Sequence, residues 1–296
     1  MKVLNFGSLN IDYVYDVEHF VERGETISSN NLQIFPGGKG LNQSIALSKA
    51  GISVYHAGII GEDGEFLKEI LEAANVNTKY LQKTKKVRTG NAIIQKDKNG
   101  DNCILLYSGS NHCITKDMVD EILNDFENGD FILLQNEINE ISYIVKEAHK
   151  KGMKVILNPS PMNEKILEIP LECVDYFILN EIEAQHLVGE KKENEILLEC
   201  LQKKFPNAEL ILTLGEDGCM YSGKEGRFEQ KSYQVPVVDT TAAGDTFTGY
   251  YLAEIFRKHS VKEALKMATR ASALAVMKKG ASPSIPVLKE VLEFED

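Results

Sequence analysis

The sequence has no tryptophan, only 8 prolines among 296 residues, and 5 cysteines. The cysteines form no CxxC pair and their number is odd, so they argue against a disulfide framework and a cysteine-built zinc site. We expect reduced thiols and assign them no chemistry. Long apolar runs are also missing, because no stretch approaches the roughly 20 residues of a membrane-spanning helix. We therefore expect no membrane partner.

Positive charge is in deficit. The chain carries 33 Lys and Arg against 44 Asp and Glu, a formal net charge of −11. Such a balance argues against a nucleic-acid partner. The first residues, MKVLNFGSLNID, are typical of an opening strand rather than a charged and cleavable signal, so we expect a cytoplasmic location.

Apolar strand-like runs alternate with amphipathic helical patterns along the chain. This order predicts an α/β fold with a doubly wound, mostly parallel sheet flanked by helices. Strands are expected at 2–6, 54–60, 131–134, 154–157, 176–179 and 210–214, and helices at 39–50, 65–74, 116–126, 141–151, 181–188, 194–205 and 246–256. We expect one domain over 1–296, with a small β-sheet lid inserted at about 12–35 and 88–107, where the residues alternate or are β-branched.

The segment 239–247, DTTAAGDTF, is the most informative in the chain. Small residues let the backbone turn tightly onto a helix whose first N–H groups can bind an anion. Ala242, Ala243 and Gly244 leave that approach open, and Asp245 is placed to accept a proton from a hydroxyl group. The run predicts an anion cradle with its own base. A simple turn whose Asp caps the helix is the alternative.

Two further segments contain small and polar residues suited to a hydroxylated ligand. The cluster at 36–43, PGGKGLNQ, lacks the GxxxxGK[ST] pattern of a phosphate loop, and by itself an ordinary glycine turn also explains it. Asn10 and Asp12 follow the first strand two residues apart, so both side chains can face one side and bind neighbouring hydroxyl groups. Together the segments favour a sugar site.

The motifs GSLNID, GGKGLNQ, LLQNE, NPSP, LNEIEA, TLGEDG, DTTAAGDTF and KGASPSIP occur in an order that resembles the ribokinase family, within the larger PfkB carbohydrate kinase group. The resemblance runs from Val3 to Pro286. It implies ATP-dependent phosphorylation of D-ribose at its terminal hydroxyl, a β-sheet lid that clasps a second subunit in a homodimer, and ATP, Mg²⁺ and K⁺ as cofactors.

The resemblance also implies roles for particular residues. Asp245 matches the catalytic base, and the amides of Ala242, Ala243 and Gly244 match the anion hole. The remaining matches fall in three groups: sugar contacts at Asn10, Asp12, Gly38, Lys39, Asn42 and Glu137; nucleotide, phosphate and magnesium contacts at Asn180, Glu183, Thr213, Gly215, Gly218, Gly244 and Thr269; and a monovalent cation site at Asp239, Thr241, Ala275, Lys278, Gly280 and Ser284.

Simpler interpretations stay open for several of these positions. Asn180 and Glu183 are typical of a helix start, Glu137 of a solvated loop acid, and Asp239 of a turn. Leu41 stands where ribokinases usually carry Ala, and Asn91 is polar within a lid strand, so the sugar pocket is expected to differ slightly. Phosphorylation of deoxyribose, fructose, adenosine or a related acceptor is the first alternative function, and a sugar sensor without transfer is the second.

Overall fold

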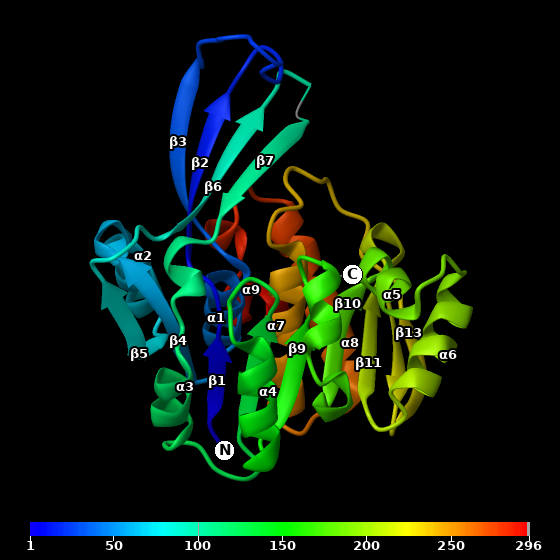
Figure 1. Ribbon diagram of the computed structural model, residues 1–296. Helices are drawn as coiled ribbons and strands as arrows, with labels where there is room; N and C mark the ends of the chain where they lie inside the picture. The colour runs from blue at the N-terminus through cyan, green and yellow to red at the C-terminus, as the bar shows by residue number, and fades with distance from the viewer. Residues whose placement is uncertain (100, 295–296) are drawn as a thin grey trace.

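The computed structural model describes residues 1–99 and 101–294. Over these residues a sheet of nine strands forms the centre of the molecule, in the order β13-β12-β11-β10-β9-β8-β1-β4-β5 (Figure 1). Its strands are β1 (Val3–Phe6), β4 (Val54–Gly61), β5 (Asn77–Thr84), β8 (Phe131–Gln135), β9 (Lys154–Asn158), β10 (Tyr176–Asn180), β11 (Glu209–Thr213), β12 (Cys219–Gly223) and β13 (Gly226–Gln230).

The pairing of the strands is mostly parallel, as the sequence predicts. Only the pairs β11·β12 and β12·β13 are antiparallel among the strands that the structure describes in this sheet. The central strands are apolar on both sides because helices cover both faces of the sheet. Alternate residues of one strand therefore enter different cores, as Val3 and Leu4 of β1 do.

Two layers of helices provide these cores. One face is covered by α1 (Lys39–Lys49), α2 (Glu65–Ala73), α7 (Ala243–Phe256), α8 (Val261–Val276) and α9 (Leu288–Glu293), and the other by α3 (Lys116–Leu123), α4 (Ile141–Lys150), α5 (Glu181–Val188) and α6 (Asn194–Lys204). Short 3-10 helices occur in the connections: η1 (Glu62–Gly64), η2 (Gly109–His112), η3 (Glu164–Glu168), η4 (Leu171–Cys173), η5 (Gly215–Asp217) and η6 (Ser282–Ser284). None of the described helices is both long and apolar enough to cross a membrane.

A second, smaller sheet projects beyond one end of the large one (Figure 1). It consists of β3 (Asn31–Gly37), β2 (Asn10–Asp16), β6 (Gly90–Lys96) and β7 (Asn102–Tyr107), in that spatial order. The β2·β6 pair is parallel, and the two outer pairs are antiparallel. This is the small sheet of the predicted fold class, and we call it the lid; residue 100, in the connection between β6 and β7, lies outside the described residues.

The order of the large sheet places a switch point beside β1. From β1 the chain moves to β4 and β5 on one side, and it later returns to add β8 and the following strands on the other side. In open α/β sheets, ligands bind in the crevice beyond the carboxyl ends of the strands at such a point. Asn10 and Glu137 follow β1 and β8, and Asn158, Asn180 and Thr213 end the next three strands.

Candidate active site

Helix α7 begins at the mouth of this crevice. Ala242 has a left-handed backbone (φ 60°), which turns the chain directly into the helix. The Ala243 amide already donates to the Thr240 carbonyl (3.2 Å), so it is not free for the anion hole. Within the described part of the chain, the amides of Gly244 and Asp245 have no backbone acceptor, as expected for a first helical turn. These two amides are the donors available to an anion.

A cavity of about 250 Å³ lies at this helix end. Its walls come from the carboxyl ends of β9, β10 and β11, from the start of α1 and from the turn before α7. The predicted site residues that line it are Lys39, Asn180, Glu183, Thr213, Ala242, Gly244 and Asp245. The residues predicted to hold phosphate and magnesium therefore line the same cavity as the proposed base.

Asp245 is buried, with 7% of its surface exposed, and both of its carboxylate oxygens accept hydrogen bonds. The side-chain amide of Asn42 donates to Oδ2 and that of Gln43 donates to Oδ1, each at 2.9 Å. Both donors belong to α1. Asn42, predicted to hold sugar, thus contacts the proposed base directly, and Gln43 is an additional partner that the sequence analysis did not assign.

Glu137 lies between the residues predicted to bind sugar and the start of α1. Its Oε2 accepts from the Lys39 backbone amide (2.9 Å) and from the Ser8 hydroxyl. Burial raises the pKa of Glu137, and Lys39 and Ser8 offset part of that effect. Burial acts to lower the pKa of the Lys39 ammonium, but the carboxylates of Asp245, Glu137 and Glu183 raise it to a net value above the ordinary one. Lys39 is therefore a cation held among three acids.

Asn10 and Asp12 lie on β2, which begins at Asn10, so the lid starts two residues earlier than the sequence predicts. Asn10 Oδ1 accepts from the side chain of Asn111 (2.8 Å), whose amide also donates to the Leu9 carbonyl (3.2 Å). Burial, with a smaller contribution from the Glu137 charge, raises the pKa of Asp12 to about 7. Asp12 thus changes charge near neutral pH.

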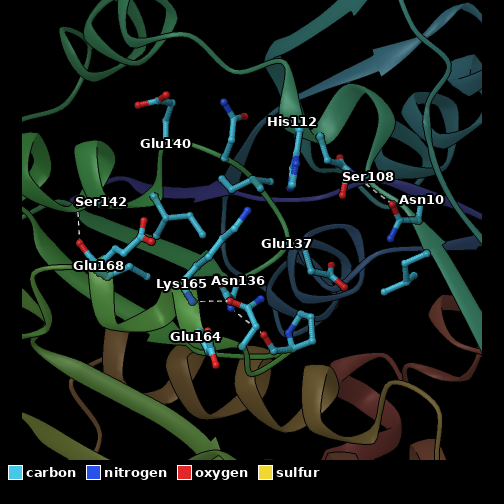
Figure 2. A pocket seen from close by; sticks show the side chains of 18 of the residues that line it. Asn10, Ser108, His112, Asn136, Glu137, Glu140, Ser142, Glu164, Lys165 and Glu168 are labelled. Carbon is cyan, nitrogen blue, oxygen red and sulfur yellow. Dashed lines mark hydrogen bonds between the residues drawn. The ribbon is translucent and has the colours of Figure 1, made fainter.

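A larger cavity, of about 850 Å³, opens beside Asn10 and Glu137. Figure 2 shows these two side chains toward one end of it, while Glu140, Glu164 and Glu168 lie toward the other. Leu106 and Tyr107, at the end of β7, also line it, so the lid contributes to its wall. The cavity is much more spacious than one pentose requires.

Asn180 and Glu183 form a capping box on α5. Asn180 Oδ1 accepts from the Glu183 amide and Glu183 Oε2 accepts from the Asn180 amide, both at 2.9 Å. The simpler interpretation of this pair as a helix start is therefore correct for the structure. Both side chains also line the smaller cavity, so the cap holds them beside the proposed phosphate position.

The other predicted nucleotide residues lie near β11 and β12. Gly215 and Gly218 have positive φ angles (56° and 102°) in the turn between these strands. Thr213 ends β11 and lines the smaller cavity. Thr269 is buried on α8, where its hydroxyl donates to the Leu265 carbonyl of its own helix (2.8 Å) and lies 3.8 Å from the Cys219 sulfur. It packs against β12 and is not among the residues that line the cavity.

Three of the predicted cation residues, Asp239, Thr241 and Gly280, contact one another. Asp239 accepts from the Thr241 hydroxyl (2.6 Å) through Oδ1 and from the Gly280 amide (2.9 Å) through Oδ2. The Ala275 carbonyl accepts from the Lys278 amide (3.1 Å), and the Ser284 hydroxyl donates to the Ala281 carbonyl (2.8 Å). The Lys278 ammonium pairs with Glu290 (2.8 Å). Since the described chain has no cluster of three His, Cys, Asp or Glu residues suited to a metal, a cation here would need backbone carbonyls.

The two departures from the family pattern differ in their surroundings. Leu41 is fully buried in the core between α1 and its neighbours, so its size is accommodated by packing. Asn91 is half-buried in β6, and its amide donates to the Thr89 carbonyl (3.2 Å).

The sequence analysis missed several polar residues near the site. They are Ser8, Gln43, Asn111, Gln135 and Asn158. All except Asn111 lie inside motifs quoted above, so their position close to an assigned residue was the available signal.

Known proteins are similar to this chain in both sequence and fold. Residues 1–288 match the pfkB family of carbohydrate kinases. The chain is 34% identical to a ribokinase of Haemophilus influenzae, with 97% of this chain and 96% of that protein aligned, and 34% identical to a ribokinase of Staphylococcus aureus, with 98% of both aligned. A solved ribokinase of Arabidopsis thaliana, complexed with ribose and ATP, superposes with a TM-score of 0.87 at 29% identity over 99% of both chains. This chain belongs to the pfkB family of carbohydrate kinases.

Proposed function

We propose that this protein transfers the γ-phosphoryl group of ATP to the terminal hydroxyl of D-ribose. The observation that carries the proposal is the position of Asp245. Its buried carboxylate lines the smaller cavity beside the two available amides of α7, and Lys39 and Glu137 connect that cavity to the larger one. The base, the anion donors and the sugar-facing residues therefore meet at one place.

In the proposed reaction Asp245 accepts the proton of the ribose hydroxyl as its oxygen attacks the γ-phosphorus. A new phosphorus–oxygen bond forms, the bond to the bridging oxygen breaks, and ADP leaves. The amides of Gly244 and Asp245 and the Lys39 ammonium stabilise the negative charge on the transferred group. Closure of the lid would exclude water and so prevent wasteful hydrolysis of ATP.

Of the residues that match the nucleotide and ion sites, Asn180, Glu183 and Thr213 line the smaller cavity, and Gly215, Gly218 and Asp239 lie outside its lining. Thr213, with the turn at Gly215 and Gly218, would hold ATP, and Asn180 and Glu183 would face the phosphates with Mg²⁺. Bound Mg²⁺ supplies charge neutralisation on the phosphate oxygens. A K⁺ ion beside Asp239 would be held by oxygen atoms, which suit such an ion. The roles of these residues and both ions are proposals.

The acceptor is proposed to be an unphosphorylated sugar. A sugar phosphate would need a free cationic side chain near the lid. Arg88, two residues before β6 of the lid, already pairs with Asp63 (2.8 Å), whose other oxygen accepts from Thr89. Four acids, Glu137, Glu140, Glu164 and Glu168, line the larger cavity against one lysine, Lys165, so the charge around it is mainly negative and disfavours a phosphate.

We also propose a homodimer formed through the lid. Tyr13 pairs with Ile34 and Ile93, and Ile93 with Leu105, so these side chains share one face of the lid, which we call the outer lid face. The opposite face carries Asp12, Ala92 and Leu106 and is directed toward the site. Ile34, Ile93 and Leu105 are 54%, 40% and 67% exposed. A second copy would cover this apolar face and the unpaired edge of β7. The cytoplasmic location stays a prediction.

The direct test measures ADP release from ATP and Mg²⁺ in the presence of K⁺. The acceptors are ribose, deoxyribose, fructose, adenosine and fructose 6-phosphate, with a control without acceptor. We expect preference for ribose. Preference for another acceptor would replace ribose in the proposal, and no ADP release with any acceptor would favour a sugar sensor.

Asp245→Asn tests the base, because the amide has nearly the same shape but little basicity. We expect kcat to fall by at least about 100-fold while sugar and ATP still bind. Near-native turnover would refute the assignment of Asp245.

Replacing K⁺ by tetramethylammonium should lower the rate of ADP release, because the larger ion does not fit a site for K⁺. Equal rates in the two salts would argue against the cation site.

A further inference from the structure

A chain of hydrogen-bonded, buried side-chain amides leads from β1 to Asp245. It consists of Asn5 on β1, Gln135 on β8 and Gln43 on α1, and we call it the amide chain. All three side chains are fully buried. They occupy the core at the switch point of the sheet, behind the two cavities.

Each hydrogen bond of the amide chain has a defined direction. Asn5 Nδ2 donates to the Gly40 carbonyl (2.7 Å) and to the Ser44 hydroxyl (2.8 Å). Asn5 Oδ1 accepts from Gln135 Nε2 (3.0 Å), which also donates to Gln43 Oε1 (2.7 Å). Gln43 Nε2 then donates to Asp245 Oδ1 (2.9 Å).

These directions leave Gln43 one orientation. The Gly40 carbonyl belongs to the backbone and can only accept, so Asn5 must direct its NH₂ group there. Gln43 Nε2 also donates to Asn158 Oδ1 (3.0 Å), and Asn158 is itself fixed by donation to the Ile178 carbonyl (2.8 Å). A reversed Gln43 would place its carbonyl against the carboxylate of Asp245, two acceptors facing each other.

One cost accompanies this arrangement. In the described part of the chain, Gln135 Oε1 is buried without a hydrogen-bond partner. A buried acceptor left unpaired costs about 1–3 kcal/mol, and an apolar side chain would avoid that cost. Gln135 is thus oriented by its two donated bonds rather than by its own carbonyl. The cost argues for a role beyond packing.

We propose that Gln43 is a positioning residue for Asp245, and that Gln135 and Asn5 fix the direction in which Gln43 donates. The inference rests on the proposed function, in which Asp245 is the base. With Asn42 on Oδ2 and Gln43 on Oδ1, the plane of the carboxylate is set by two consecutive residues of α1. Gln43 and Gln135 lie behind the carboxylate and line neither cavity.

The test is the kinetics of Gln43→Met and Gln135→Met, which keep side-chain length but remove the amides. We expect Gln43→Met to lower kcat about 10- to 100-fold, because small misplacements of a reacting group have effects of this size. KM for ribose and for ATP should stay within about threefold, since neither substrate touches Gln43. Gln135→Met should lower kcat in the same direction by a smaller factor.

The double variant separates positioning from general destabilisation. If both residues act through one contact, the loss of kcat in the double variant should be close to that of Gln43→Met alone. Ser48→Ala is the matched control. Ser48 is also on α1 and donates to the Ala74 carbonyl, away from Asp245, so its removal should cost stability in urea unfolding while kcat stays at the wild-type value.

Two outcomes would overturn the inference. One is a wild-type kcat in Gln43→Met, or in Gln135→Met if the first variant does not fold, alongside an inactive Asp245→Asn. The other is a rise in KM that accounts for the whole loss of kcat/KM. Wild-type turnover in Asp245→Asn would instead refute the proposed role of Asp245 as the base, and no ADP release by the wild type with any acceptor would refute the proposed activity, so these failures are distinguishable.

Discussion

Gly244 lies where a side chain would meet open space rather than protein. Apart from its chain neighbours and the adjoining backbone of α7, no described heavy atom is within 4 Å of the position that its Cβ would occupy. Because Ala favours helices over Gly by roughly 1 kcal/mol, Gly244→Ala should leave stability unchanged or slightly higher. The added methyl group would enter the proposed phosphate position, so we expect KM for ATP to rise and kcat to fall by about tenfold or more. Thermal unfolding and steady-state kinetics check both parts. Unchanged kinetics would place the phosphate elsewhere.

Asp12 should make ribose binding depend on pH. Its pKa is raised to about 7, mainly by burial, so the carboxyl group is largely protonated below that pH and ionised above it. Ionised Asp12 is the better acceptor for ribose hydroxyl groups. KM for ribose should therefore fall as the pH rises from about 6 to about 8. The control is Asp12→Asn, which should have a higher KM and a flatter profile. An equally steep profile in the variant would assign the dependence to another group.

Individual residues of the site differ in how far sequence could predict them. Asp245 and Gly244 were predictable because small residues before a helix have a local physical meaning. The contacts from Asn42 and Gln43 to Asp245 were not, since they join residues about 200 positions apart. Lys39 and Glu137 were assigned from the family resemblance, but their mutual contact depends on the register of α1 against β8, which no local pattern specifies.

At the scale of elements, the strands that the sequence predicts are buried and apolar, and most of those that it misses are polar edge strands. The six predicted strands are apolar runs buried between helices. β5, β12 and β13 were not predicted, because β5 and β13 are polar edge strands and β12 pairs antiparallel beside one of them. A strand with one solvated side lacks the continuous apolar run that marks a central parallel strand.

The contact between β4 and α1 has a consequence for stability. His56 of β4 is fully buried, and its Nδ1 lies 2.8 Å from the Ser44 hydroxyl of α1. Burial lowers the pKa of His56 from 6.5 to about 4, against a smaller opposing effect of the Gly7 backbone. The unfolded chain therefore binds a proton first as the pH falls. The stabilisation is complete above about pH 6.5 and is lost on going down to about pH 4.

His56→Asn tests this account, because Asn keeps a polar partner for Ser44 without titrating. Between about pH 7 and pH 4.5, the wild type should lose about 2 kcal/mol more of its free energy of unfolding than the variant. Urea unfolding at the two pH values measures the difference. The exposed His149, changed to Asn, is the control and should follow the wild type. Equal losses in wild type and His56→Asn would contradict the assignment.

At the scale of the whole molecule, the proposed lid dimer predicts a mass of twice 33.0 kDa by light scattering. Leu105→Lys places a charge on the outer lid face, on the edge strand β7, and should yield single chains, because an unpaired buried charge is costly. Leu167→Lys is the matched control, since Leu167 is 65% exposed but lies in η3, away from the lid. A wild-type mass of one chain would refute the dimer, and a dimeric Leu105→Lys would place the interface elsewhere.

The separation of Asp245 from its partners also bears on protein synthesis. Asn42 and Gln43 leave the ribosome early, whereas the carboxylate that they hold is about 200 residues further along. Until α7 has been made, the Asn42 amide has no Asp245 carboxylate to donate to, and the Gln43 amide keeps only Asn158 of its two acceptors. A nascent chain that ends before Ala243 contains the residues of β1 to β13, but it lacks Asp245 and the helices α7, α8 and α9 that cover one face of the sheet. Premature termination there would thus release a chain that leaves one apolar face of its strands uncovered and lacks the proposed base.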